Sequence, residues 1–113
     1  MSHKAEIKNF LEMIMAGEIR EAFDLYVAED FVHHNQHTKP GREELIVGME
    51  GNHGNFPDKI FVIEMMIEEG DKVMSYSLLK FSPEHTGLRV VHIFRFADNK
   101  IVEMRDVVMQ LGE

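Results

Sequence analysis

The stretch that decides the fold is residues 88–110, LRVVHIFRFADNKIVEMRDVVMQ. Two segments rich in Val, Ile and Phe flank a turn at residues 97–99, where Asp and Asn favour a tight hairpin. Residues 59–81 repeat this arrangement around the Gly70-Asp71 pair. The sequence therefore predicts two consecutive β-hairpins in the second half of the chain.

The first half predicts helices. A first helix is bounded by Ser2 as N-cap and Gly17 as stop. Its apolar positions recur at helical spacing: Ile7, Phe10, Leu11 and Ile14. Further helices are expected over residues 19–26 and 41–50, with an extended segment over residues 31–37. Helices followed by an antiparallel meander predict an α+β fold in which the helices cover one face of the sheet.

Composition restricts the class of protein. The chain has 113 residues, which predicts a single domain over residues 1–113. A net charge of −8 argues against nucleic acid or an anionic membrane as partner. The absence of cysteine excludes a disulfide framework, a thiolate metal site and a cysteine nucleophile. With no signal-peptide pattern and no membrane-length apolar run, a cytoplasmic protein is expected.

The first hairpin is assigned a buried face from its hydropathy. A two-residue loop at Gly70-Asp71 pairs Glu69 with Lys72 and fixes which side chains share a face. Tyr76 is the only hydroxyl on the more apolar face. That face is predicted to be inside: Phe61, Ile63, Met65, Ile67, Met74, Tyr76 and Leu78.

The second hairpin allows two registers, and hydropathy favours the one that pairs Phe96 with Lys100. Its inner face would carry these residues: Val90, His92, Phe94, Phe96, Val102, Met104, Asp106 and Val108. Ile101 would lie on the outer face. His92 and Asp106 would then be diagonal neighbours about 7 Å apart on an otherwise apolar face.

The pair His92 and Asp106 is the main candidate site, because a carboxylate on an apolar face is costly to bury. It is either an acid–base pair lining a cavity or a structural Asp–His pair. A metal site built on the histidines at 33, 34 and 37 is not favoured, since an extended segment turns His33 and His34 to opposite sides. We expect no metal and no cofactor.

Four segments, in this order, resemble a known family. They are FVHHNQ (residues 31–36), EGDKV (69–73), VHIFRF (91–96) and NKIVEMRD (99–106). Together they resemble the SnoaL-like polyketide cyclases, within the nuclear-transport-factor-2-like superfamily. The resemblance implies a cone-shaped, cystatin-like fold in which a curved antiparallel sheet wraps around helices and leaves a central pocket.

The resemblance also implies site residues. Asp106 falls on the general base of the cyclases, and His92 replaces an Asp on the neighbouring strand, so these two are the predicted catalytic residues. Met104 stands where the family has a His. The predicted substrate-binding residues are His34, Asn35, Tyr76, Met104 and Gln110.

These observations predict a small-molecule enzyme. Its chemistry would be cofactor-free proton transfer beside a carbonyl group, giving aldol-type cyclisation or isomerisation of a small apolar molecule. The alternative is a non-catalytic binding domain of the same fold, and a metal-dependent enzyme is a weaker third possibility. The resemblance further implies a homodimer packed through the outer sheet face, which carries Val91, Ile93, Arg95, Arg105 and Val107.

Overall fold

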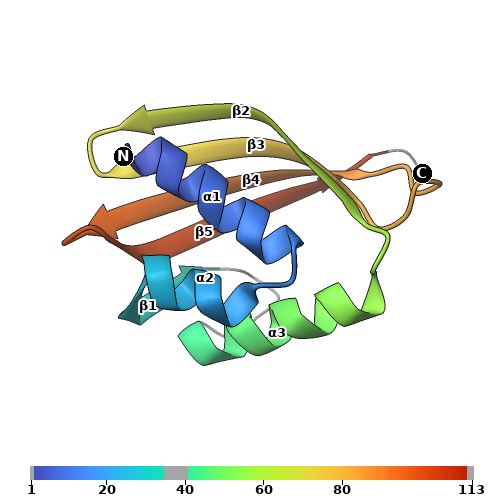
Figure 1. Ribbon diagram of the computed structural model, residues 1–113. Coiled ribbons are helices and arrows are strands. Elements are labelled where there is room, and N and C mark those ends of the chain that lie inside the picture. Colours follow the sequence, from blue (N-terminus) through green and yellow to red (C-terminus); the bar gives the residue numbers. More distant parts are fainter. Residues whose placement is uncertain (1, 35–40, 112–113) are drawn as a thin grey trace.

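The computed structural model describes residues 2–34 and 41–111. Over these residues the elements follow in chain order: α1 (His3–Met15), α2 (Ile19–Tyr26), β1 (Val27–His34), α3 (Arg42–Asn55), β2 (Ile60–Glu69), β3 (Lys72–Lys80), β4 (Leu88–Ala97) and β5 (Lys100–Gln110). The sheet has the order β1-β5-β4-β3-β2 and curls around the helices without closing (Figure 1). The predicted α+β architecture is confirmed.

Local chemistry marks the two ends of helix α1. The Ser2 side chain accepts a hydrogen bond from the Ala5 N–H at 3.1 Å and caps α1. Gly17 follows α1 with a φ of 88°, a conformation that glycine adopts without steric cost. None of the described helices is both long enough and apolar enough to cross a bilayer.

An aromatic cluster joins the helices to the sheet. Phe10 of α1 packs against Phe23 of α2 and Phe94 of β4, with ring centroids 5.5 and 6.1 Å apart. Phe23 in turn meets Phe31 of β1 at 6.2 Å. Because these buried rings come from both layers, they fix the position of the helices over the inner face of the sheet.

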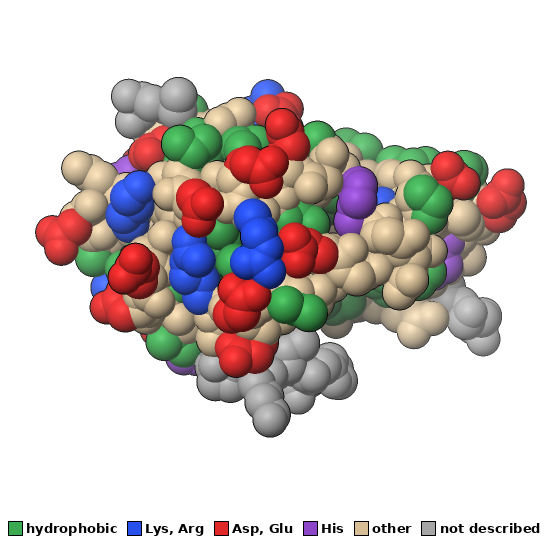
Figure 2. All heavy atoms as spheres, turned by 60° about the horizontal axis from the view of Figure 1, so that its bottom comes forward, with side chains coloured by type: hydrophobic (Ala, Val, Ile, Leu, Met, Phe, Trp, Pro, Cys, Tyr) green, Lys and Arg blue, Asp and Glu red, His purple; other side chains and the backbone are tan. Residues whose placement is uncertain are grey.

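Helix α3 is longer than predicted, reaching Asn55 rather than ending near residue 50. A loop was expected to follow residue 50, but neither Gly51 nor Gly54 has a positive φ, and the helix continues through both. On its outer side, Glu43 and Glu50 pair with Arg20 of α2. Figure 2 shows this helical face, where acidic and basic side chains are interspersed.

Strand β1 gives the sheet a feature that the sequence did not predict. It lies parallel to β5, with His33 beside Met104 and His34 beside Arg105, whereas all other neighbouring strands are antiparallel. The sheet is therefore mixed. The parallel pairing brings the segment around residue 33 against the end of the chain that carries Asp106.

The predicted inner face of the first hairpin is wrong over most of its length. The turn pairs Glu69 with Lys72 as expected, but a bulge at Glu64 shifts the register farther along β2. The inward residues are Phe61, Ile63, Met66, Val73, Ser75 and Ser77. Met65, Ile67, Met74, Tyr76 and Leu78 face outward. Hydropathy misled because the outer face is itself apolar, whereas two serines lie inside.

The second hairpin follows neither expected register along its whole length. Asp98 and Asn99 both have positive φ, 51° and 64°, and form a tight two-residue turn. A bulge then shifts the pairing between Phe96 and Arg95, so Ile101, not Val102, points inward and is buried. Beyond the bulge, His92 lies directly opposite Asp106 rather than diagonal to it.

Candidate functional site

A cavity of about 380 Å³ lies between helices α1 and α3 and the inner face of the sheet. Its size is at the lower end of the range for small-molecule sites. The walls are mainly apolar and include these residues: Phe10, Leu11, Ile14, Met15, Leu45, Met49, Phe61, Leu79, Phe81, Leu88, Val90, Met104 and Val108. Polar side chains enter the cavity from β1, β4, β5 and α3 and from the residue before β2.

Asp106 and His33 form the central polar contact. His33 Nε2 lies 3.2 Å from Asp106 Oδ2, within hydrogen-bond distance. The side chain of His33 is 2% exposed and that of Asp106 14% exposed. Burial makes this hydrogen bond matter more than a surface pair, because water does not compete for either group. The contact fixes the orientation of the Asp106 carboxylate at the cavity wall.

His92 is the third polar group of this wall. Burial lowers its pKa to about 4, although the Asp106 charge opposes that effect and His33 adds to it. The ring is therefore neutral at pH 7 and carries one N–H donor. Its Nδ1 is buried and has no hydrogen-bond partner among the described residues. A buried imidazole without a partner for Nδ1 is suited to bind a polar ligand atom.

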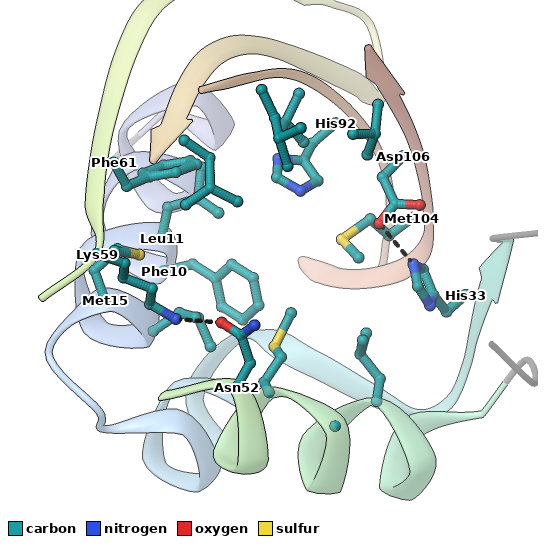
Figure 3. A pocket seen from close by; sticks show the side chains of 18 of the residues that line it. Phe10, Leu11, Met15, His33, Asn52, Lys59, Phe61, His92, Met104 and Asp106 are labelled. Carbon is teal, nitrogen blue, oxygen red and sulfur yellow. Dashed lines mark hydrogen bonds and ion pairs between the residues drawn. The ribbon is translucent and has the colours of Figure 1, made fainter. Parts of the chain in front are cut away.

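A second polar contact lies across the cavity from the first. Lys59, which precedes β2, donates a hydrogen bond from Nζ to Asn52 Oδ1 of α3 at 2.7 Å. Figure 3 shows this contact on one side of the cavity and the contact between His33 and Asp106 on the other. Apolar side chains line the cavity between them. A bound molecule would meet a polar group at each end and apolar walls along its length.

Two of the predicted binding residues lie elsewhere. Tyr76 belongs to the outer face of β3, where the Arg89 guanidinium sits 5.5 Å from the centre of its ring. His34 points away from His33 and contacts Glu103 at 2.9 Å. Hydrogen bonds from Arg95 and His34 lower the pKa of Glu103 to about 2, so His34 belongs to a polar network on the outer sheet face.

Of the other predicted residues, some line the cavity and others do not. Met104 lines the cavity, as do Asp106 and His92. Gln110 is exposed at the end of β5 and is not among the lining residues. Asn35 lies outside the described residues.

Sequence reasoning missed His33, Lys59 and Asn52. The alternation of β1 could have found His33, because residues two apart in a strand share a face and Phe31 is an obvious core residue. Asn52 follows Leu45 by seven positions and would have joined its helical stripe had α3 been extended. Lys59 carries no pattern of its own, since only the tertiary structure brings it to the cavity.

Among residues 2–34 and 41–111, no three His, Asp or Glu side chains converge as metal ligands would. His37, one of the histidines considered for such a site, lies outside the described residues.

The arrangement supplies the two groups that proton abstraction needs. A carboxylate held by a hydrogen bond can accept a proton from carbon, and a neutral imidazole can donate a hydrogen bond to the oxygen that becomes negative. Both groups face one cavity from neighbouring strands. The apolar walls strengthen electrostatic interactions within it.

Comparison with known proteins agrees with this fold. The profile of the SnoaL-like polyketide cyclase family matches residues 5–112. Among curated proteins, no sequence matches the chain. An uncharacterised cystatin-fold protein from Novosphingobium aromaticivorans superposes with a TM-score of 0.81 at 17% identity, covering 95% of this chain and 98% of that one.

Two further solved structures are similar. A protein from Jannaschia sp. CCS1, assigned as a SnoaL-like polyketide cyclase, gives a TM-score of 0.69 at 20% identity, with 91% of this chain and 84% of that one covered. IdmH from Streptomyces antibioticus, assigned as a polyketide cyclase, gives a TM-score of 0.75 at 20% identity, with 92% and 89% covered. At such identities the likeness concerns the fold.

Proposed function

Because the chain belongs to the SnoaL-like polyketide cyclase family, we propose that it catalyses acid–base chemistry beside a carbonyl group without a cofactor. The reaction would be an aldol-type ring closure or an isomerisation of a small apolar molecule. The observation that carries the proposal is the position of Asp106, held by His33 and directly opposite neutral His92 on an apolar cavity wall.

In this proposal Asp106 is the general base. Its carboxylate takes a proton from the carbon next to the substrate carbonyl, and the electron pair of the broken C–H bond forms the enolate double bond while the carbonyl oxygen becomes negative. For ring closure, the enolate carbon attacks a second carbonyl of the same molecule, whose oxygen receives the proton from Asp106. For isomerisation, the proton returns to a different carbon.

The two histidines have separate roles. His92 donates a hydrogen bond to the enolate oxygen, and as a neutral group it leaves the negative charge of Asp106 available for proton abstraction. His33 is a positioning residue that holds Oδ2 of Asp106 and so directs the carboxylate. A neutral donor opposite a carboxylate is one combination that supports enolate chemistry.

Proton exchange tests the proposal without knowledge of the natural substrate. Cyclic ketones such as 2-tetralone and 1-indanone are incubated with the protein in D₂O, and loss of their α-proton signals is followed by NMR. We expect catalysed exchange with at least one ketone. In Asp106→Asn the rate should fall by roughly 100-fold or more, the usual contribution of a general base.

Asp30→Asn is the matched control, because it removes an exposed carboxylate of β1 and should leave exchange unchanged. His92→Phe should slow exchange, and His92→Gln should restore part of the rate by supplying an N–H donor. Exchange that is equally fast in Asp106→Asn would refute the assignment of the base. Retention of a co-purified molecule without turnover would favour the binding domain instead.

We also propose that the protein is a homodimer through the outer sheet face. Apolar side chains on this face are unusually exposed, with Met65 at 50%, Ile67 at 49% and Val107 at 60%. Val91 and Ile93 lie between them on the central strand β4. A contiguous apolar patch of this kind favours protein–protein contact.

A further inference from the structure

The contact between Lys59 and Asn52 has no role in proton abstraction, yet it lines the same cavity. Lys59 is the only Lys or Arg among the described lining residues. It forms no ion pair with any described carboxylate, and its hydrogen-bond partner is a neutral amide. In a chain with a net charge of −8, a half-buried ammonium without an acidic partner is notable.

Glu44, the acidic side chain of α3 that lines the cavity, does not pair with Lys59. The carboxylate of Glu44 folds back over Gly41, where a Cβ built on that glycine would lie 1.8 Å from Glu44 Oε1. Burial lowers the pKa of Lys59, and no neighbouring carboxylate offsets this effect. The ammonium is thus partly removed from water, and no charge of the protein offsets the cost. An anionic group of a ligand would offset it.

Asn52 completes a donor pair. Because its Oδ1 accepts from Lys59, its Nδ2 remains as a donor. An ammonium and an adjacent amide N–H can each donate to one oxygen of a carboxylate. Asn52 and Leu45 are two turns apart on the side of α3 that lines the cavity, so the rigid helix holds the amide in place.

We propose that Lys59 and Asn52 bind a carboxylate of the substrate, at the side of the cavity opposite Asp106. The substrate is then an apolar keto acid whose carboxylate contacts Lys59 and whose reacting carbon lies at Asp106. This inference deepens the proposed function and rests on the cavity being its substrate site. The net negative charge does not attract anions from a distance, so the selection comes from direct contact at Lys59.

Binding of matched acids and esters tests this inference. The probes are 1-naphthoic, 2-naphthoic and biphenyl-4-carboxylic acid, each with its methyl ester, titrated at pH 7 into the isotopically labelled protein and followed by NMR. We expect at least one acid to bind about tenfold more tightly than its ester, as a charge-assisted hydrogen bond provides. In Lys59→Met this preference should disappear while ester binding is unchanged.

Three variants serve as controls. Lys59→Arg retains the positive charge and should retain the preference for the acid. Asn52→Asp places a carboxylate beside Lys59 and should abolish it. Lys4→Met makes the same charge change at an exposed position of α1 and should have no effect.

The proposal is wrong if no acid binds better than its ester, or if the preference survives in Lys59→Met. It is also wrong if Lys59→Met only lowers the melting temperature, since the pair is then a structural link between α3 and β2. None of these probes has an exchangeable proton beside its carbonyl. The test therefore measures binding alone, and its outcome is separate from that of the exchange experiment with Asp106→Asn.

Discussion

Three side chains from three strands determine what the cavity wall can do. Asp106 and His33 differ in depth, 14% and 2% exposed, so the histidine supports the carboxylate from within the protein while the carboxylate faces the ligand space. His92 contributes through its charge state. Phe61 and Phe94 lie close to its ring, with centroids 6.4 and 5.7 Å away, and such apolar neighbours disfavour protonation.

The lowered pKa of His92 makes stability depend on pH. The native pKa is about 4 and the reference value 6.5, so between these pH values the unfolded chain binds a proton that the native protein does not. Stability contributed by neutral His92 is complete above pH 6.5 and is lost as the pH falls toward 4. Between pH 7 and pH 4.5 the free energy of unfolding of the wild-type protein should fall by about 2–3 kcal/mol more than that of His92→Gln.

Urea denaturation of both proteins at the two pH values measures this difference. Other acid-sensitive groups are common to both proteins and cancel in the comparison. A parallel loss of stability in the two proteins would show that His92 is not held neutral by burial.

Part of the candidate site could be predicted from the sequence. His92 and Asp106 were predicted to share a face because a carboxylate stood out in an apolar pattern, and the structure places them opposite one another. His34 was chosen over His33 from the resemblance alone. Strand alternation from Phe31 would have selected His33, because residues two apart in an extended segment share a face.

At the scale of elements, two bulges decide which side chains reach the cavity. In β5 the bulge allows Ile101 and Met104, an odd number of positions apart, both to point inward. In β2 the bulge at Glu64 does the same for Ile63 and Met66. The turns could be predicted from Gly70-Asp71 and Asp98-Asn99. The bulges could not, because the residues around Glu64 and Val102 carry no turn signal that would mark an extra residue in the strand.

Helix α3 shapes the cavity through Gly48, which lines it and whose added Cβ would meet nothing within 4 Å. Gly48→Leu should gain roughly 0.5–1 kcal/mol of stability from helix propensity, as should Gly51→Leu, where a Cβ is equally unobstructed. Only Gly48→Leu should weaken binding of whichever aromatic acid the wild-type protein binds, because Gly51 is not among the residues that line the cavity.

Thermal unfolding and the NMR titration provide the two measurements for this pair. Equal loss of binding of that acid in both glycine variants would contradict its placement in the cavity.

At the scale of the whole molecule, the sheet separates two apolar surfaces. The inner surface is covered by helices, whereas the outer one carries Met65, Ile67 and Val107 in exposed positions. Hydropathy placed the more apolar face of the first hairpin inside, whereas Met65 and Ile67 of that face are exposed on the outer surface. The order of helices and hairpins was enough to predict the α+β class. The family resemblance added the cystatin-like shape.

The proposed dimer leads to a prediction for the outer sheet face. Val107→Glu should convert a dimer into a folded monomer, because it places a charge within an apolar contact. Val47→Glu is a matched control, since Val47 is similarly exposed, at 55%, but lies on α3. Sedimentation velocity should give a monomer for the first variant and a dimer for the second and the wild type. A monomeric wild-type protein would contradict the dimer.

The contact between His33 and Asp106 joins residues that are 73 positions apart in the chain. Each hairpin, in contrast, pairs two strands that a short turn joins. Long-range pairing carries a larger loop-closure cost and tends to form late in folding. His33 therefore reaches the Asp106 carboxylate only when β1 docks against β5, so a partly folded chain, even with both hairpins in place, would lack the contact that positions the base of the proposed reaction.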